Sequence, residues 1–340
     1  MLSASTTIAT TKTFMTEATL PLVIEPLDKN MTLNEFLHYL QDENPAIKQE
    51  LLHHGGILFR NFPVRCVEDY AAVIRALGTG KCLNYVGGDS PRTKIKDGVF
   101  TSTEAPPNFK IFLHNELSFM DKYPSHIYFY CDIPSAVGGE TIIADARKIY
   151  DAIDPDVRQR FITKGLKYVS CYHNNYESLM NRLTGGAHKS WVHVFETDDQ
   201  KEVEKRCREN GIQFEWHKNN WIEISHVRPA TMQHPITREN VWFNQAQLFD
   251  FNARMLGWWR YVALKVIYCR PHTTLHKIFY GDGTKIPQED LYHVLDVLDQ
   301  QTVAFPWQKG DVLMLDNVLA MHGRNTFTGK RRILTAMTGG

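Results

Sequence analysis

The chain has 340 residues, of which 43% are hydrophobic, and its 38 basic residues balance its 38 acidic residues. This is the composition of a globular protein with ample core material, and it excludes a strongly basic nucleic-acid-binding domain or an acidic tail. No apolar run approaches the roughly 18 residues of a membrane span, and the cysteines form no Cys-x-x-Cys motif. We therefore expect a soluble, cytoplasmic protein without structural disulfides.

The N-terminal part of the chain predicts a disordered lead followed by two helices. Residues 1–20, rich in Ser and Thr, are expected to be disordered, so that a single domain spans residues 21–340. Thr32 and Glu35 have the spacing of a capping box, which begins a helix. A second helix is expected from Asn44 and ends at a glycine pair, where a left-handed turn is easily formed.

Short strands separated by turns dominate the rest of the chain. Alternating or continuous apolar patterns predict strands at 56–63, 99–104, 110–113, 125–131, 141–145, 166–171, 226–232, 242–247, 303–307, 312–316 and 332–337. Helical periodicity predicts helices at 68–77, 146–153, 156–164, 198–210 and 288–298. The pattern indicates a mainly β fold with flanking helices, a double-stranded β-helix or jelly roll, with a large insertion around 172–300. The mouth of such a barrel is a natural ligand site.

One strand ends in the triplet His114-Asn115-Glu116. Residues two apart point to the same face of a strand, so an imidazole and a carboxylate are presented together to a metal. A His-x-Glu triplet is expected by chance about once in a chain this rich in histidine, so other residues must support the site. A second histidine would complete a facial triad, which suits Fe(II). Zinc can use the same ligands, but no His-Glu-x-x-His helix is present.

Several further motifs occur in an order that is similar to a known family. They are His114-x-Glu116, Gly138-Gly139-Glu140-Thr141, Trp307-x-x-Gly310-Asp311, Asp316-Asn317, His322 and Arg331-Arg332. In this order the chain resembles the iron(II)- and 2-oxoglutarate-dependent dioxygenases of the taurine dioxygenase and clavaminate synthase type, from about residue 55 to 338. A Tyr-Val-Gly-Gly loop at 85–88 and a Glu-x-Pro-Pro turn at 104–107 are most similar to the clavaminate synthase-like branch.

The resemblance implies the residues of an iron site. His114, Glu116 and His322 would be the Fe(II) ligands, leaving positions for 2-oxoglutarate and dioxygen. Halogenases of this kind carry a small residue in place of the carboxylate, so Glu116 favours hydroxylation over halogenation.

The resemblance also implies the residues that hold the cosubstrate. Arg332 would bind the far carboxylate of 2-oxoglutarate, a task that suits the planar guanidinium, and Thr141 would assist it. Since strand residues alternate between faces, we expect Arg332 to face inward and Arg331 outward. Taurine-type members place an arginine four residues after the cosubstrate arginine, where this chain has Ala336.

The implied reaction hydroxylates an unactivated C–H group of a small amino-acid-like substrate, free or carrier-bound and including arginine-like molecules, with release of succinate and carbon dioxide. The candidate substrate-binding residues are Tyr85, Glu104, Lys110, Asn115, Trp242 and Asn244. Desaturation or cyclisation by the same cofactors, a non-catalytic jelly-roll binding protein and a zinc hydrolase are the alternatives. No nucleic-acid or membrane partner is expected.

Overall fold

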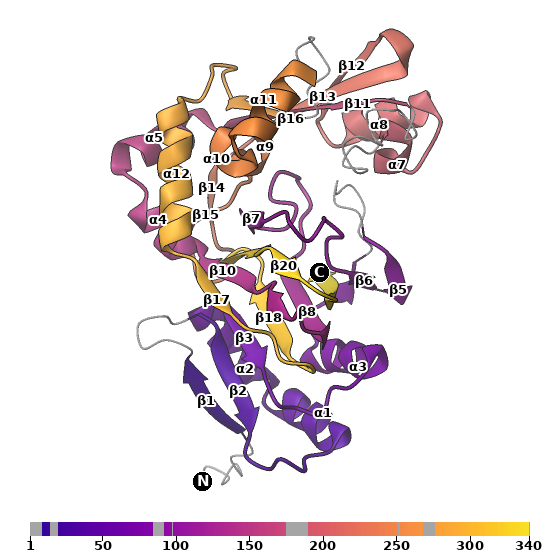
Figure 1. Ribbon diagram of the computed structural model, residues 1–340, viewed down its shortest axis with the longest axis vertical. Coiled ribbons are helices and arrows are strands. Elements are labelled where there is room, and N and C mark those ends of the chain that lie inside the picture. Colours follow the sequence, from indigo (N-terminus) through magenta and orange to yellow (C-terminus); the bar gives the residue numbers. More distant parts are fainter. Residues whose placement is uncertain are drawn as a thin grey trace.

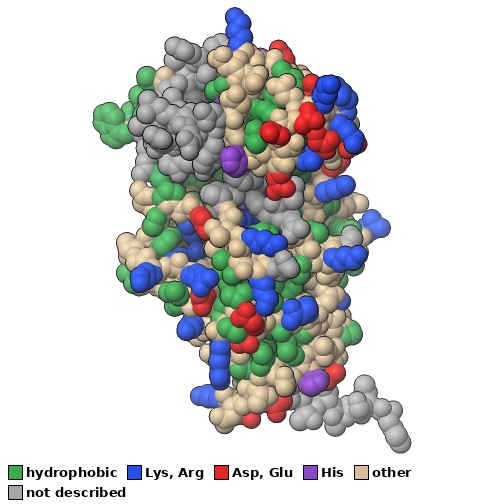
Figure 2. Space-filling view, turned by 90° about the vertical axis from the view of Figure 1, so that its right-hand side faces the viewer, with side chains coloured by type: hydrophobic (Ala, Val, Ile, Leu, Met, Phe, Trp, Pro, Cys, Tyr) green, Lys and Arg blue, Asp and Glu red, His purple; other side chains and the backbone are tan. Residues whose placement is uncertain are grey.

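The protein consists of a strand-rich body and a smaller lobe above it (Figure 1). The structure, a computed structural model, describes residues 9–13, 20–83, 92–96, 98–174, 190–250, 252–267 and 276–339. Charged side chains of both signs are interspersed over the face in Figure 2, in keeping with a formal net charge of zero. In the described part of the chain, no helix is both long and apolar enough to span a bilayer.

Two sheets form the body. The larger contains, in spatial order, β1 (Ala9–Thr13), β2 (Leu22–Pro26), β3 (Gly56–Phe59), β18 (Val312–Asp316), β8 (His126–Ile133), β21 (Arg332–Gly339), β6 (Val99–Thr101) and β5 (Lys94–Lys96), and β4 (Lys81–Cys82) also pairs with β21. The smaller contains β17 (Val303–Phe305), β10 (Thr141–Asp145), β19 (Ala320–Arg324) and β7 (Ile111–His114). A short ribbon joins β9 (Val137–Gly138) to β20 (Phe327–Thr328).

The two sheets pack face to face around one apolar layer. Phe129 and Leu313 of the larger sheet and Ile143 and Phe305 of the smaller sheet belong to this buried cluster. Because strand residues alternate, Tyr128 instead faces the opposite side of the large sheet, where the helices lie. The predicted fold class, a mainly β jelly roll with flanking helices, is confirmed.

Helices α1 (Leu33–Asp42), α2 (Asn44–His54) and α3 (Val67–Leu77) cover the outer face of the large sheet. The predicted capping box is present, since the Glu35 amide donates to the Thr32 hydroxyl and the Thr32 amide donates to the Glu35 carboxylate. As predicted, α2 ends at Gly55, whose φ of +78° is left-handed. These helices therefore begin and end where local sequence chemistry predicts.

The upper lobe is built on a separate four-stranded sheet, with the order β12 (Gln213–His217), β13 (Trp221–Arg228), β11 (Leu166–Tyr172) and β16 (His276–Tyr280). Its other elements are α7 (Trp191–Phe195), α8 (Gln200–Glu209), α9 (Ala246–Phe249), α10 (Ala253–Leu256) and α11 (Trp258–Ile267). Helices α4 (Ala146–Ala152), α5 (Pro155–Lys164) and α12 (Gln288–Gln300) run along one side of the molecule. The lobe thus occupies most of the region expected as an insertion.

The expected strands at 56–63 and 99–104 are shorter in the structure, as β3 and β6, and three other expectations differ from it more clearly. Part of the expected disordered lead forms strand β1, because residues 9–13 pair in register with β2; residues 1–8 and 14–19 lie outside the described residues. The expected strand at 226–232 is divided between β13 and β14 (Thr231–Gln233). The expected strand at 242–247 ends early, since β15 (Asn240–Trp242) is followed by α9.

Candidate metal centre and cosubstrate site

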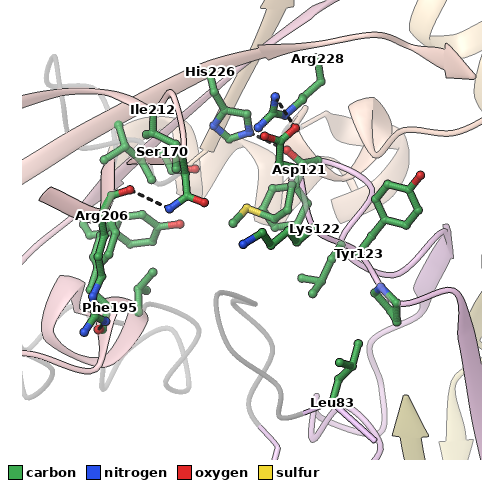
Figure 3. Close-up of a pocket in the computed structure, with 18 of the residues that line it drawn as sticks. Leu83, Asp121, Lys122, Tyr123, Ser170, Phe195, Arg206, Ile212, His226 and Arg228 are labelled. Atoms are coloured by element: carbon green, nitrogen blue, oxygen red, sulfur yellow. Dashed lines mark hydrogen bonds and ion pairs between the residues drawn. The ribbon is translucent and has the colours of Figure 1, made fainter. Parts of the chain in front are cut away.

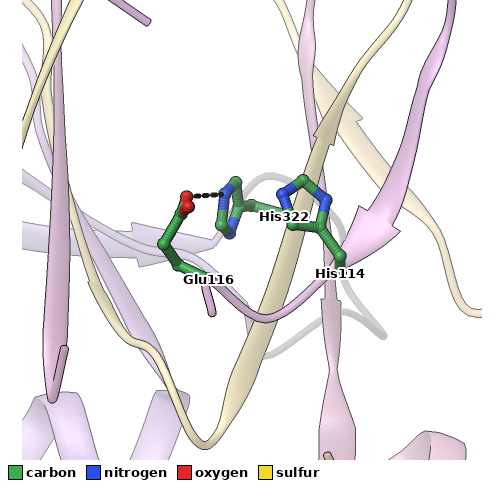
Figure 4. A group of neighbouring side chains, drawn as sticks. All are labelled: His114, Glu116 and His322. Carbon is green, nitrogen blue, oxygen red and sulfur yellow. Dashed lines mark ion pairs between the residues drawn. The ribbon is translucent and has the colours of Figure 1, made fainter. Parts of the chain in front are cut away.

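Neighbouring strands bring the two predicted histidine ligands together. Strands β7 and β19 are antiparallel, and His114 lies directly opposite His322 in their register. The ring centroids are 4.4 Å apart, and Glu116, just beyond the end of β7, places its Oε2 3.5 Å from His322 Nε2 (Figure 4). One ligand atom from each residue lies within 4.8 Å of the other two. This arrangement fits a single metal ion held on one face.

Close contact between these strands requires a glycine. A Cβ atom at Gly323 would lie 2.4 Å from the carbonyl oxygen of Ile111, and the register is irregular at this point, between His322 and Arg324. Because Gly323 has no side chain, β19 can approach β7 closely enough for the two histidines to bind the same metal ion.

The backbone of Glu116 is held by the Asn317 side chain. Asn317 Oδ1 accepts from the Glu116 amide at 2.7 Å, and Asn317 Nδ2 donates to the Glu116 carbonyl at 3.0 Å and the Pro124 carbonyl at 2.8 Å. A buried amide can satisfy both backbone groups at once because it is both donor and acceptor. Asn317 is thus a positioning residue, and the sequence showed it only as part of a motif.

Electrostatics favour the metal-binding protonation states. Burial opposes ionisation of Glu116, but the Arg92 guanidinium, 2.7 Å from Oε2, and the neighbouring His322 hold the pKa of Glu116 well below its ordinary value. The surrounding protein and the adjacent His322 ring lower the pKa of His114 to about 4. Glu116 is therefore ionised and His114 neutral at pH 7, as metal ligands must be. Sequence reasoning missed Arg92, a single arginine in a loop.

Hydrogen bonding also selects the His114 tautomer. Nδ1 lies 2.8 Å from the Phe112 carbonyl oxygen, which can only accept, so Nδ1 carries the proton. The Nε2 lone pair is left for a metal, as is usual for histidine ligands with a carbonyl partner.

A small cavity adjoins the two histidines. Its other lining residues are Arg92, Ser102, Thr103, Ile111, Phe129, Thr141, Gly323, Arg324, Arg331 and Ile333. Thr141 Oγ1 accepts from Trp307 Nε1 at 3.0 Å, which leaves its hydroxyl hydrogen available to a ligand. The cavity therefore combines the metal ligands with a hydroxyl donor and arginine side chains.

The predicted orientation of the arginine pair is wrong. Arg331 lines the cavity, whereas the Arg332 side chain is 44% exposed and pairs with Asp132 at 2.9 Å. Ile333 and Met337 belong to the apolar layer between the sheets, and Arg331 shares their face of the chain. Successive side chains do alternate between the two faces of the strand, but Arg331 and not Arg332 lies on the inner face. If Arg331 is the cosubstrate arginine, the position four residues later, where taurine-type members have an arginine, is Thr335.

Arg331 is held in place by the glycine turn before β10. Its Nε donates to the Gly139 carbonyl at 2.9 Å, and a Cβ at Gly139 would lie 3.1 Å from Arg331 Cδ. Burial, followed by the charge of Arg324, lowers the pKa of Arg331 to about 10, so it remains a cation at neutral pH. This cation faces the cavity of the two histidines.

Arg324, on β19, fixes the Glu-x-Pro-Pro turn beside the cavity. It donates to the carbonyl oxygens of Ala105 at 3.1 Å, Pro106 at 2.9 Å and Phe109 at 2.9 Å. The sequence analysis missed this role, because residues more than 200 positions apart form the contact.

Glu104 and Lys110, two of the predicted substrate residues, are not among the residues that line the cavity. Glu104 is exposed and accepts from the Thr101 hydroxyl at 2.7 Å, and Lys110 pairs with Asp299 of α12 at 3.3 Å. Tyr85 lies outside the described residues. Both described side chains have partners in the fold itself, so their contacts give no support to a substrate role.

The other three predicted substrate residues are fully buried. Asn115 Nδ2 donates to the Asn317 carbonyl at 2.7 Å, Asn244 Nδ2 donates to the Ala230 carbonyl at 2.7 Å, and the Trp242 ring packs on Phe161 with centroids 5.1 Å apart. Their contacts are with other buried groups of the protein, as is usual for core residues.

Two glutamines that sequence reasoning missed support the first metal-binding strand. Gln245 donates to the Asn115 carbonyl and Gln247 to the Leu113 carbonyl, each at 2.6 Å. Their alternating polar pattern had predicted a strand. In the folded protein it serves to satisfy the backbone around the end of β7.

A jelly roll with two histidines, a carboxylate and a nearby threonine and arginine is characteristic of Fe(II)- and 2-oxoglutarate-dependent oxygenases, which are enzymes. The family model for taurine catabolism dioxygenase TauD, TfdA family, matches residues 20–338, and the chain belongs to this family. Its cofactors are Fe(II), 2-oxoglutarate and dioxygen, and the three predicted ligands fit the metal in residue type and spacing.

Comparison with known proteins agrees. The chain is 34% identical to the dapdiamide synthesis protein DdaC of Enterobacter agglomerans over 86% of this chain and 84% of that one, and 29% identical to a clavaminate synthase-like protein of Arabidopsis thaliana over 93% of each. Among solved structures, AAD-2 with Mn(II) and N-oxalylglycine has a TM-score of 0.53 at 14% identity, covering 98% of this chain and 97% of that one. PvcB of Pseudomonas aeruginosa has a TM-score of 0.51 at 15% identity, covering 94% and 86%. These two structures share the fold.

Proposed function

We propose that the protein hydroxylates an unactivated C–H group of a small amino-acid-like substrate, with release of succinate and carbon dioxide. The observation that carries the proposal is the grouping of half-buried His114 with buried Glu116 and His322, beside the cavity lined by Thr141 and Arg331. The amino-acid class is supported by the names of the two relatives, a dapdiamide synthesis protein and a clavaminate synthase-like protein.

The side chains have separate tasks. His114, Glu116 and His322 would hold the iron, which when bound supplies the oxidative decarboxylation of 2-oxoglutarate by dioxygen. Arg331 would bind the far carboxylate of 2-oxoglutarate with a charge-assisted hydrogen bond, and Thr141 would donate its hydroxyl hydrogen to the same group. Arg331 thereby takes the role that the sequence had suggested for Arg332.

Retention of Glu116 as a carboxylate supports oxygen insertion rather than halogen transfer. Desaturation and cyclisation use the same residues and differ in the fate of the substrate radical, so the product distinguishes them. A non-catalytic binding protein is disfavoured because all three ligand residues are present and lie close enough together to hold one metal ion.

The experiment is anaerobic loading with Fe(II) and 2-oxoglutarate, followed by exposure to air with pooled amino acids and ascorbate. We expect succinate, and a product heavier than its substrate by one oxygen atom in the mass spectrum. Glu116→Ala should abolish both, while Arg332→Ala serves as a matched surface control. Binding of Fe(II) and 2-oxoglutarate without succinate from any amino acid would instead support a binding protein, and a product lighter by two hydrogens would indicate desaturation or cyclisation.

A further inference from the structure

A second and larger cavity is lined by the loop that follows Glu116. It has a volume of about 360 Å³ and is enclosed by the loop at 117–124, by β11 and β13, and by α7 and α8 (Figure 3). Leu117, which directly follows the metal ligand, is one of its lining residues. The wall of the cavity therefore includes the residue next to a metal ligand along the chain, and the volume lies in the range usual for small-molecule sites.

The walls of this cavity are mainly apolar. Besides Leu117 they include Phe119 from the same loop, Ile212 and Ile224 from the upper lobe, and Met337 from the inner face of β21. Burial of alkyl groups against such walls is favourable, whereas a guanidinium or sulfonate would lose its hydration without gaining matched partners.

The charged groups of the cavity are mostly paired within the protein. Asp121 binds Arg228 at 3.0 Å, and Arg206 binds Glu202 at 2.8 Å. Lys122 is exposed and has no ion-pair partner among the described residues. An ammonium group at the rim of an apolar cavity is suited to an anionic end of a ligand, such as a carboxylate.

A hydrogen-bond acceptor lies beside these charges. His226 is buried, and Figure 3 shows its ring pointing from β13 into the cavity next to Asp121. His226 Nε2 lies 2.7 Å from the Phe119 carbonyl oxygen and so carries the proton, and His226 Nδ1 has no hydrogen-bond partner among the described residues. A buried acceptor of this kind is best satisfied by an N–H donor.

We propose that this cavity is the substrate site and that the substrate is an α-amino acid with an extended apolar side chain, not an arginine-like one. Lys122 would bind the carboxylate and His226 the ammonium group, while the side chain lies along Ile212 and Leu117 toward the metal. The proposal rests on the proposed oxygenase function and specifies its substrate class. The oxidised carbon belongs to the side chain of the amino acid.

The test measures binding to protein loaded with Mn(II) and N-oxalylglycine by isothermal titration calorimetry. The probes are L-norvaline, L-norleucine and L-2-aminooctanoate, with L-arginine and octylamine for comparison. Affinity should rise about fourfold for each added methylene. Arginine, which has the wrong side chain, and octylamine, which lacks the carboxylate, should bind at least about tenfold more weakly than L-2-aminooctanoate, because each leaves one group of the site unmatched. Equal affinities along the series, or preferred binding of arginine, would overturn the proposal.

Variants separate the cavity from the metal centre. Ile212→Trp should fill the cavity and remove the dependence on chain length, with Ile212→Phe as a milder substitute if the first variant does not fold. Lys122→Glu should weaken L-2-aminooctanoate about fivefold, and Lys148→Glu, an exposed lysine on α4, should change nothing. Unchanged binding in the Ile212 and Lys122 variants overturns the assignment of the cavity. Failure of Mn(II) and N-oxalylglycine themselves to bind would overturn the proposed function instead.

Discussion

Substitution of the two adjacent arginines provides the sharpest test of the cosubstrate site. In Arg331→Ala the cavity loses one of the arginines that line it, whereas Arg332→Ala removes only a surface ion pair with Asp132. The two variants delete the same side chain from neighbouring positions, so any general effect of lost charge is shared. A difference between them therefore reports on which arginine faces the cosubstrate.

The magnitudes follow from the two environments. A 2-oxoglutarate carboxylate left without its cation in a buried cavity loses about 3 kcal/mol, which is roughly a 100-fold weaker affinity. The Arg332 side chain is 44% exposed, and exposed ion pairs contribute only about 0 to 1 kcal/mol to stability. Arg332→Ala should therefore leave the affinity for 2-oxoglutarate unchanged within about twofold.

The assay is an anaerobic calorimetric titration of the Mn(II)-loaded variants with 2-oxoglutarate. Circular dichroism and Mn(II) affinity serve as checks that each variant is folded and still binds metal. The reasoning is refuted if Arg332→Ala weakens 2-oxoglutarate binding by the larger factor, or if Arg331→Ala binds it as tightly as the unaltered protein.

Three further predictions concern the framework around the site. Asn317→Ala should weaken Mn(II) binding about 10- to 100-fold, because it releases the backbone of the carboxylate ligand Glu116. Electron paramagnetic resonance can monitor the Mn(II) titration, and an unchanged Mn(II) affinity would contradict this prediction. Gly323→Ala places a Cβ 2.4 Å from the Ile111 carbonyl oxygen, so the unfolding free energy should fall by about 1 to 3 kcal/mol. A thermal midpoint equal to that of the parent protein would contradict this, because it would show that the two strands adjust without cost. Burial lowers the pKa values of His126 and His226, so below the ordinary histidine pKa the unfolded chain binds more protons than the folded protein. The metal-free protein should therefore lose stability as the pH falls from 7 toward 5. A thermal midpoint that stays constant or rises over this interval would rule out the effect.

The sequence by itself determined the features that depend on neighbouring residues or on residue type. The capping box at Thr32 and the glycine end of α2 are local, because their hydrogen bonds span only a few positions. Alternation of apolar residues predicted strands and hence a jelly roll. His114, Glu116 and His322 could be selected because few residue types bind iron and their order matched a family.

Only the tertiary structure decided which face of each strand is the inner one and which distant groups meet there. Period-two alternation separates Arg331 from Arg332 but does not say which side holds the core, and the packing of Ile333 between the sheets supplies that answer. The ion pair of Arg92 with Glu116 depends on a contact between segments that have no pattern in common. A local sequence carries little information about such contacts, since they form only when strands and loops from different parts of the chain are packed together.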